Sequence, residues 1–387
     1  MIDTPPENPL SLRVCQIGTT AFPSTKCQNR AIGGIPGYIY DLLQGLLIEG
    51  IYVDFVGKIY NYDKRDYLTY HETQRDVKTT HGFLIALLMQ SIIISLNERT
   101  IIHAHRPDHL AVFSLFKKNP ALVTLHGQQS ITINKRKNLL IRAIYSFLEK
   151  IALKKALRIL ATDLITYKYY CNAYPAFADK IDIIPTGVNM SLFRPLDKYT
   201  CRSKHQLSGS AKIILYLGRV EPPKKVEEII KAFEKLYHAN PNYILLIIGD
   251  GKQLQEMIGL TRKLSISDAV LFFGARMREE LPELINCADI SVLYSGNEGS
   301  PLSVKESLAC GVPVVANRVG DIDAIITNGK NGYIVYNESI DTLASAIKKC
   351  LSEADLMKEF CVRSCEMYST SLIHHKIINI YKEIQNV

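Results

Sequence analysis

The sequence predicts an α/β protein built from two doubly wound, parallel-sheet domains of the Rossmann type. Its 387 residues exceed what one hydrophobic core usually organises, so two domains are expected. Short apolar, β-branched runs alternate along the whole chain with longer segments of helical period. Such continuous apolar strands, separated by helices, are typical of parallel sheets that are buried on both faces. A hydrophobic share of 47% and a charged share of 22% fit a soluble globular protein.

The strands divide into two sets along the chain. The first set is expected at residues 13–18, 52–57, 100–105, 121–126, 157–162 and 181–185. The second set is expected at residues 212–218, 243–249, 269–274, 289–294, 313–317 and 332–335. We therefore predict a first domain over residues 1–195, a second over 196–370, and a C-terminal helix over 371–387 that packs back on the first domain. The polar stretch 196–211 has no clear period and is expected to be a linker.

Membrane spans, secretion signals and disulfides are not expected. The longest apolar run, residues 83–96, is too short to cross a bilayer, so we expect a buried helix there. The acidic start, with two adjacent prolines, does not resemble a secretory signal. Nine scattered cysteines indicate reduced thiols in a cytoplasmic protein. Cys361 and Cys365 lie four residues apart on a predicted helix, where buried thiols are favoured over metal ligands.

Positive charge is concentrated in one region of the chain. Residues 110–160 contain ten lysines and arginines and the single acid Glu149, a net charge of +9. The whole protein carries +8, so the rest of the chain is near neutral. Large apolar residues are interspersed with these cations over residues 131–160, as in a helix that lies at a membrane interface. This pattern predicts docking on an anionic membrane surface. A helix that faces the core, with solvated lysines, is the alternative.

Two acids flank a predicted helix start at "NEGSPLSVKE", residues 297–306. Ser300 is expected to cap the helix and Pro301 to lie in its first turn. The N-terminus of such a helix offers unpaired N–H groups to a phosphate. Glu298 precedes this anion site and Glu306 follows it, and carboxylates accept hydrogen bonds from sugar and ribose hydroxyls.

Cations follow the first strand of the second domain. In "LGRVEPPKK" Arg219, Lys224 and Lys225 come directly after the strand at 212–218. Arginine binds diphosphate oxygens in a fork and lysine adds a point charge. Because ligands of parallel sheets bind at the carboxyl ends of the strands, these cations are candidates for the same anion site. Solvated loop cations are the alternative that spacing alone leaves open.

These segments resemble the retaining family 4 glycosyltransferases, or glycosyltransferase group 1, which have the GT-B fold of two Rossmann-like domains facing across a cleft. The pair Glu298 and Glu306 is similar to the family signature of two acids separated by seven residues. Further segments resemble the family in the same order along the chain, namely "AIGGIPGYIYDLL", "LVTLHG", "IPTGVNMSLFRP", "LGRVEPPKK", "IIGDG", "FFGA" and "SLACGVPVVA".

The resemblance implies roles for individual residues. Arg219 and Lys224 would bind the donor diphosphate, and Glu298 would hold the transferred sugar. His126 would face that sugar from the first domain. The remaining donor-binding positions would be Gly33, Gly34, Lys225, Gly249, Ala275, Arg276, Pro301, Leu302, Ser303 and Glu306.

The sequence also departs from the family pattern. Lys225 stands where the family usually has glycine, so which of the two lysines binds phosphate is open. Asp321 and Ala324 stand where a glycine and a glutamate are common. Asp321 and Asp323 form a D-x-D pattern, but a metal is not expected because cations and a helix end already supply positive charge. Likewise, we expect hydrogen-bonded histidines rather than metal ligands in "HAHRPDH", residues 103–109.

The resemblance implies a hexosyltransferase that moves a sugar from a nucleoside-diphosphate sugar to a hydroxyl of a glycan or lipid-linked acceptor, with retention. No cofactor or nucleic-acid partner is expected. A sugar-nucleotide epimerase of the same fold and a non-catalytic nucleotide-sugar-binding protein remain alternatives. A nicotinamide oxidoreductase is disfavoured, because no G-x-G-x-x-G follows the first strand, where "QIGTTAFPS" stands instead.

Overall fold

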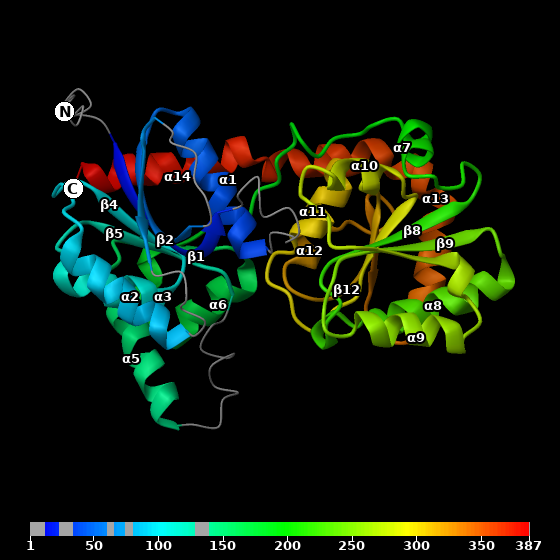
Figure 1. Cartoon of the computed structure of the whole chain (residues 1–387), viewed down its shortest axis with the longest axis horizontal. Helices are drawn as coiled ribbons and strands as arrows, with labels where there is room; N and C mark the ends of the chain where they lie inside the picture. The colour runs from blue at the N-terminus through cyan, green and yellow to red at the C-terminus, as the bar shows by residue number, and fades with distance from the viewer. Residues whose placement is uncertain (1–11, 23–33, 60–65, 74–79, 128–138, 387) are drawn as a thin grey trace. The chain divides into compact units, whose positions relative to one another are not determined.

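The computed structural model describes residues 12–22, 34–59, 66–73, 80–127 and 139–386, which form two compact units (Figure 1). Unit 1 contains most of the chain up to Pro185, together with Ser371–Val387. Unit 2 contains Thr186–Thr370. The chain therefore passes from one unit to the other after Pro185 and returns after Thr370.

Unit 1 is a seven-stranded parallel sheet with the order β3-β2-β1-β4-β5-β6-β7. Its strands are β1 (Arg13–Phe22), β2 (Tyr52–Ile59), β3 (Leu68–Glu72), β4 (Ile101–Ala104), β5 (Ala121–Leu125), β6 (Arg158–Ala161) and β7 (Ile181–Ile183). Its helices are α1 (Gly34–Ile48), α2 (Thr80–Ile93), α3 (Pro107–Phe113), η1 (Ser114–Phe116), α5 (Leu139–Lys155), α6 (Leu164–Ala173), η2 (Pro175–Lys180) and α14 (Thr370–Gln385).

Helices cover both faces of this sheet. Alternate strand residues point to opposite faces, so neighbours such as Val14 and Cys15 lie in two separate hydrophobic cores. One core is closed by α1 and α14, and the other by α2, α3, α5 and α6 (Figure 1). Helix α14, drawn in red, thus supplies core residues such as Ile377 to unit 1 although it comes last in the chain.

Unit 2 is a six-stranded parallel sheet with the order β10-β9-β8-β11-β12-β13. Its strands are β8 (Lys212–Leu217), β9 (Tyr243–Ile248), β10 (Val270–Gly274), β11 (Ile290–Leu293), β12 (Val314–Asn317) and β13 (Gly332–Val335). Its helices are α7 (Lys198–Lys204), η3 (Pro222–Lys224), α8 (Val226–Ala239), α9 (Leu254–Lys263), η4 (Ser267–Ala269), α10 (Leu281–Asn286), α11 (Leu302–Ala309), α12 (Ile322–Ile325), α13 (Ile340–Cys365) and η5 (Glu366–Tyr368).

The predicted fold class is confirmed, since both sheets are parallel, covered by helices and doubly wound. Every strand predicted from the sequence exists. The sequence missed β3, whose side chains are only partly buried and whose residues "LTYHE" carry no continuous apolar run. A half-buried edge strand lacks the signal by which the central strands were found.

The prediction of a linker over residues 196–211 is wrong. This stretch contains α7, which begins after Asp197, whose carboxylate accepts a hydrogen bond from the Thr200 N–H at 2.8 Å. The buried Arg202 donates from Nε to the Cys287 carbonyl at 2.8 Å and from Nη2 to Asp289 at 2.8 Å. The stretch is therefore a packed part of unit 2, held by long-range polar contacts that local sequence does not reveal.

The expectation of a buried helix at residues 83–96 is only half right. Residues 80–93 form α2, and Phe83 and Leu87 lie in the core of unit 1. Its outer side nevertheless exposes Ile85, Met89 and Ile92, and 70% of Ile93. The helix contains no charged residue, so its exposed face is apolar.

Candidate active site

The strand order of unit 2 reverses between β8 and β11. From β8 the chain proceeds outward to β9 and β10, and it then returns to β11 on the opposite side of β8. At such a switch point the loops after the two central strands diverge and leave room for a ligand at the carboxyl edge of the sheet. The loop after β8 carries Arg219 and Lys224, and the loop after β11 carries Glu298. The topology therefore brings together residues that lie more than 70 positions apart.

Short hydrogen bonds join these two loops. Ser295 Oγ donates to the Pro223 carbonyl at 2.9 Å, and the Gly296 N–H donates to the same oxygen at 2.7 Å. Asn317, at the end of β12, accepts from the Ser295 N–H at 2.9 Å and donates to the Ser295 carbonyl at 2.8 Å. Residues that follow or end the neighbouring strands β8, β11 and β12 thus hold the loop that carries Glu298.

Lys224 and Glu298 form an ion pair across the switch point. Lys224 Nζ lies 2.5 Å from Glu298 Oε1, and both side chains are largely buried. An ammonium group has three N–H donors, so Lys224 can hold this carboxylate and still donate to a phosphate oxygen. The pair places a cation and a hydroxyl acceptor side by side, which is the combination that a sugar diphosphate requires.

Lys225 points in a different direction. Its Nζ lies 2.5 Å from Glu338 Oε2 and 5.3 Å from the ring centroid of Tyr294. The hydrogen bond from Lys225 is the main reason why the pKa of Glu338 is lowered. The backbone of Lys225 has φ of +42°, in the left-handed region that favours glycine, which gives a physical reason for glycine at this place in the family. The geometry favours Lys224 over Lys225 as the phosphate ligand.

Arg219 is the most accessible of the predicted cations. Its side chain is 68% exposed and pairs through Nη1 with Glu221 Oε2 at 2.8 Å. Tyr216, buried at the end of β8, donates its hydroxyl to the Arg219 carbonyl at 2.7 Å and so fixes the backbone from which the guanidinium extends. An exposed surface pair of this kind is weak, so an anionic ligand can compete for the arginine.

The helix that follows the Glu298 loop is α11, and the prediction that Ser300 caps it is wrong. Pro301 occupies the cap position with φ of −70°, and no side chain caps the helix. Ser300 Oγ instead accepts from Lys305 Nζ at 2.6 Å. Leu302 and Ser303 are the first helical residues and are partly exposed. Because the first N–H groups of a helix have no partner within it, they remain suited to a phosphate oxygen.

Glu306 lies in α11 beside an arginine that the sequence did not single out. Arg278 Nη2 is 3.5 Å from Glu306 Oε1, and both side chains are almost fully buried. The predicted Arg276 lies elsewhere, with Nη1 3.6 Å from Glu280 Oε1 and its guanidinium 5.5 Å from the Phe273 ring centroid. Both arginines follow β10, so the strand-end rule could have found Arg278, but nothing local shows which of the two meets Glu306.

The remaining donor-side positions are backbone features. Gly249 follows β9 with φ of +142°, and a side chain there would meet the Gly218 carbonyl at 1.8 Å, so only glycine allows the loops after β8 and β9 to pack. Ala275 follows β10 and is partly exposed. Gly34 is the first residue of α1, whereas Gly33 lies outside the described residues.

Unit 1 gathers histidines at the carboxyl edge of its own sheet. His126 follows β5, and its Nε2 lies 3.4 Å from Nδ1 of His105, which follows β4. His103 is hydrogen-bonded through Nδ1 to the Tyr381 hydroxyl at 2.6 Å and through Nε2 to Thr124 Oγ1 at 2.7 Å. Burial lowers the pKa of both His103 and His126 to about 3. These rings are therefore neutral and act as hydrogen-bonding groups rather than cations.

Within the described residues, no group of three or more His, Cys, Asp and Glu side chains is arranged to hold a metal ion. The two acids of the D-x-D pattern have separate partners. Asp323 Oδ2 accepts from exposed Arg318 at 2.7 Å, whereas buried Asp321 lies 4.0 Å from Lys305 Nζ. Cys361 and Cys365 are buried thiols, and burial raises the pKa of Cys365 to about 12.

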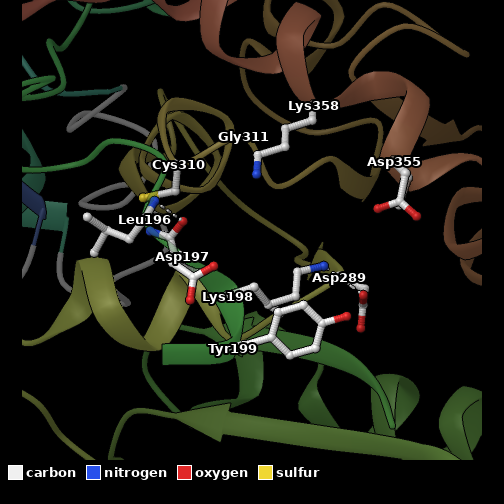
Figure 2. Close-up of a pocket in the computed structure, with 12 residues that line it drawn as sticks. Leu196, Asp197, Lys198, Tyr199, Asp289, Cys310, Gly311, Asp355 and Lys358 are labelled. Atoms are coloured by element: carbon white, nitrogen blue, oxygen red, sulfur yellow. Dashed lines mark hydrogen bonds and ion pairs between the residues drawn. The ribbon is translucent and has the colours of Figure 1, made fainter. Parts of the chain in front are cut away.

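A separate cavity of about 290 Å³ lies at the other edge of the unit 2 sheet (Figure 2). Asp289 precedes β11 and Gly311 precedes β12, so this hollow is at the amino ends of the strands. Figure 2 shows Lys198 and Asp289 facing each other, with Lys198 Nζ 2.9 Å from Asp289 Oδ1. Because parallel sheets bind ligands at their carboxyl edge, we do not assign the donor to this cavity.

Two Rossmann-like parallel sheets, one with a charged switch point, define a protein of the GT-B class. Family models match most of the described chain: "Glycosyltransferase Family 4" over residues 32–192 and "Glycosyl transferases group 1" over residues 197–363. The chain belongs to this glycosyltransferase family.

Curated relatives match about half of the chain. A D-inositol 3-phosphate glycosyltransferase of Segniliparus rotundus is 28% identical over 182 residues, 46% of this chain and 40% of that protein. An N-acetyl-alpha-D-glucosaminyl L-malate synthase of Bacillus anthracis is 28% identical over 188 residues, 49% of each chain. The matched region thus spans half or less of the length of these two relatives.

Solved structures match nearly the whole chain. Sucrose-phosphate synthase from Thermosynechococcus elongatus superposes with a TM-score of 0.79 at 21% identity, covering 96% of this chain and 99% of that chain. The Anabaena protein HepE, in complex with UDP and glucose, superposes with a TM-score of 0.74 at 15% identity, covering 96% and 99%. At these identities the likeness shows the shared fold.

Proposed function

We propose that the protein transfers a hexosyl group, with retention, from a nucleoside-diphosphate sugar to a hydroxyl of a glycan or lipid-linked acceptor. The observation that carries the proposal is the ion pair of Lys224 and Glu298 at the switch point of unit 2, 2.5 Å apart and next to the open start of α11. Membership of a glycosyltransferase family supports it. The Anabaena neighbour, whose structure contains UDP and glucose, makes UDP sugars the first donors to try.

The chemistry follows from where charge develops. Breaking the bond between the sugar and the diphosphate leaves negative charge on the phosphate oxygens and positive charge on the sugar ring. Lys224, Arg219 and the first amides of α11 would stabilise the phosphate, and the Glu298 carboxylate would hold sugar hydroxyls. Glu306, oriented by Arg278, would accept from the ribose. The phosphate would then accept the proton of the attacking hydroxyl on the same face of the sugar.

We further propose that no divalent cation takes part, because fixed cations and helix amides already meet the phosphate. Transfer measured with and without EDTA tests this part separately. Equal rates are expected, and complete loss of transfer in EDTA that Mg²⁺ or Mn²⁺ restores would overturn it.

The decisive experiment incubates the protein with UDP, GDP and ADP sugars together with a lipid extract and free glycans. We expect released nucleotide together with a heavier acceptor, whose new linkage NMR shows to retain the donor's anomeric configuration. Binding without any product would identify a non-catalytic nucleotide-sugar-binding protein. A changed sugar without a larger glycoside would identify an epimerase.

For the acceptor, we propose that unit 1 docks on an anionic membrane surface. The basic segment 131–160 is described from residue 139 onward, where α5 exposes 73% of Leu139 and 65% of Phe147 next to exposed Lys150 and Lys154. Helix α2, which like α5 packs against α3, also exposes apolar side chains. Exposed apolar side chains beside lysines are typical of interfacial helices. No helix among the described residues is long and apolar enough to span a bilayer.

Vesicle flotation tests this surface. Vesicles of phosphatidylglycerol should bind the protein, vesicles of phosphatidylcholine should not, and added salt should weaken binding because it screens the lysines. Replacing both Phe147 and Ile93 by serine should lower partitioning onto the vesicles about tenfold or more, because each change removes apolar area that the membrane would bury. Leu356→Ser, at an apolar position of unit 2 that is 87% exposed, is the control. No binding to anionic vesicles at any salt concentration would contradict the proposal.

A further inference from the structure

A fully buried lysine lies directly before the second acid of the site. Lys305 in α11 has 0% of its side chain exposed. Its ammonium donates to the Thr186 carbonyl at 2.9 Å, to Thr186 Oγ1 at 3.1 Å and to Ser300 Oγ at 2.6 Å. It also lies 4.5 Å from the ring centroid of Tyr368 and 4.0 Å from Asp321 Oδ2.

Such a group is costly to bury, so its partners have to compensate. Moving an ammonium group from water into the protein interior is unfavourable unless charges and hydrogen bonds replace the solvent. Ser300 and Thr186 supply oxygen acceptors, and Asp321 and Tyr368 supply negative potential. A leucine or methionine at this helix position would need none of this. The lysine therefore fixes the positions of its partners rather than merely filling the core.

The partners belong to different parts of unit 2. Ser300 ends the loop that follows β11 and lies two residues after Glu298. Thr186 is the residue at which the chain enters unit 2. From its base in α11, Lys305 thus connects the Glu298 loop to the chain entry.

The Glu298 loop has a second support on its other side. The Asp321 N–H donates to the Gly299 carbonyl at 3.0 Å. Gly320, with φ of +59°, allows this approach, because a side chain there would meet the Gly299 carbonyl at 2.1 Å. The loop is therefore held by a backbone hydrogen bond at Gly299 and by the ammonium contact at Ser300. Both contacts restrain the backbone next to Glu298, whose carboxylate pairs with Lys224.

We propose that Lys305 is a positioning residue for glycosyl transfer: its buried ammonium holds Ser300 against Thr186 and thereby fixes the carboxylate of Glu298. Lys305 touches no reacting atom, and its effect passes through the loop. This inference rests on the proposed function, in which Glu298 holds the transferred sugar. Glu306 pairs with Arg278, whose guanidinium lies over the Phe193 ring, and neither contact involves Lys305. Nucleotide binding is therefore expected to depend little on Lys305.

The test uses Lys305→Met, which keeps the length and apolar part of the side chain and removes the donor. We expect kcat to fall about 10- to 100-fold, as for a displacement of about 1 Å at a reacting centre, while the Kd for the nucleoside diphosphate changes less than about threefold. Ser300→Ala should lower kcat about fivefold to tenfold. The double variant should be no slower than Lys305→Met, because both changes break the same link.

Two further measurements separate positioning from a general loss of structure. Lys349→Met, at an exposed lysine over the Tyr333 ring in the same unit, is the matched control and should keep wild-type kcat. Hydrogen exchange of a peptide spanning residues 295–301 should become faster in Lys305→Met. This readout needs no activity, so it tests the link even if the wild-type protein transfers nothing to any acceptor, which would count against the proposed function alone.

Three results would overturn the inference. The first is an unchanged kcat in a folded Lys305→Met variant. The second is full multiplication of the two single effects in the double variant, which would mean that Lys305 does not act through Ser300. The third is unchanged exchange in residues 295–301. If Lys305→Met does not fold, Ser300→Ala decides alone, and wild-type kcat in that variant would contradict the proposal.

Discussion

Units 1 and 2 each contain a parallel sheet whose strand order reverses, yet the residues predicted to act at the two sheet edges differ in charge. Unit 2 brings Lys224, Glu298 and Arg219 to its switch point, all of them charged. Unit 1 brings His105 and His126 to the corresponding edge, and burial holds the pKa of His126 at about 3, so the ring is neutral. The same backbone topology therefore carries a charged cluster at the switch point of unit 2 and a pair of histidines, His126 being neutral, in unit 1.

Under the proposed function, the difference indicates which unit would meet the charged part of the substrate. A diphosphate needs fixed cations, and unit 2 would supply them together with a helix start. A sugar or acceptor hydroxyl needs only neutral donors and acceptors, which the histidines of unit 1 would supply. Changes in unit 2 should thus alter nucleotide binding or the departure of the phosphate, whereas changes at the unit 1 edge should leave nucleotide affinity intact.

The largest effect is expected from Glu298→Gln. Loss of the carboxylate removes the acceptor for sugar hydroxyls at the reacting centre, so kcat should fall about 100- to 1,000-fold. Nucleoside diphosphate should still bind, because Lys224 keeps its charge. Isothermal titration calorimetry and a nucleotide-release assay measure the two quantities side by side. Glu279→Gln, an exposed acid after β10, is the control, and wild-type turnover in Glu298→Gln would remove Glu298 from the site.

The next largest difference is expected at acid pH, where unit 1 should lose stability before unit 2. Burial lowers the pKa of His103 and His126 to about 3 and of His109 and His374 to about 4, and all four lie in unit 1. The unfolded chain binds protons near the ordinary pKa of 6.5 whereas the folded unit does not. The contribution of these histidines to the free energy of unfolding of unit 1 is therefore fully present above pH 6.5. It is lost as the pH falls toward their folded-state pKa values, by about 1.4 kcal/mol per pH unit for each histidine.

Hydrogen exchange at pH 7.5 and pH 5, corrected for the intrinsic rates, measures this difference. Protection should fall in β4, β5 and α14 of unit 1 before it falls in β8 and β9 of unit 2. In unit 2 the lowered pKa of Asp289, which hydrogen bonds from Lys198 and Ile213 sustain against burial, costs stability only below about pH 4. Equal loss of protection in both units at pH 5 would contradict the assignment of neutral histidines.

The charged site shows how far local sequence carries a prediction. The strands and their end loops were predictable, because buried parallel strands are continuous apolar runs and functional residues follow them. A local rule predicts that Ser300 caps a helix, but its Oγ accepts a hydrogen bond from Lys305, five residues later. Arg278 meets Glu306 across 28 positions, and α7 is anchored by Arg202 to residues some 85 positions away. Such partners are set by tertiary packing, which spacing does not reveal.

A smaller effect is expected from the two neighbouring lysines, and it sharpens the assignment within unit 2. Lys224→Met should weaken nucleoside-diphosphate binding and lower kcat, each by about tenfold, since it removes one charge-assisted hydrogen bond and leaves Glu298 without its cation. Lys225→Met should change both by less than about threefold, because Lys225 is bound to Glu338. Lys358→Met, at the cavity on the other edge of the sheet, is the control. A larger effect from Lys225 than from Lys224 would reverse the assignment.

The smallest effect is expected at the neutral edge of unit 1. His126→Ala removes one neutral hydrogen-bonding group, which contributes about 1 kcal/mol, so kcat should fall about fivefold while the Kd for the nucleoside diphosphate stays the same. Because the ring is neutral at every pH above about 4, the remaining activity should keep the wild-type pH profile from pH 5 to 8. His238→Ala, at an exposed histidine of unit 2, controls for the loss of an imidazole. A weakened nucleotide affinity in His126→Ala, or a changed pH profile, would mean that unit 1 also acts on the charged part of the donor and that the division between the two edges fails.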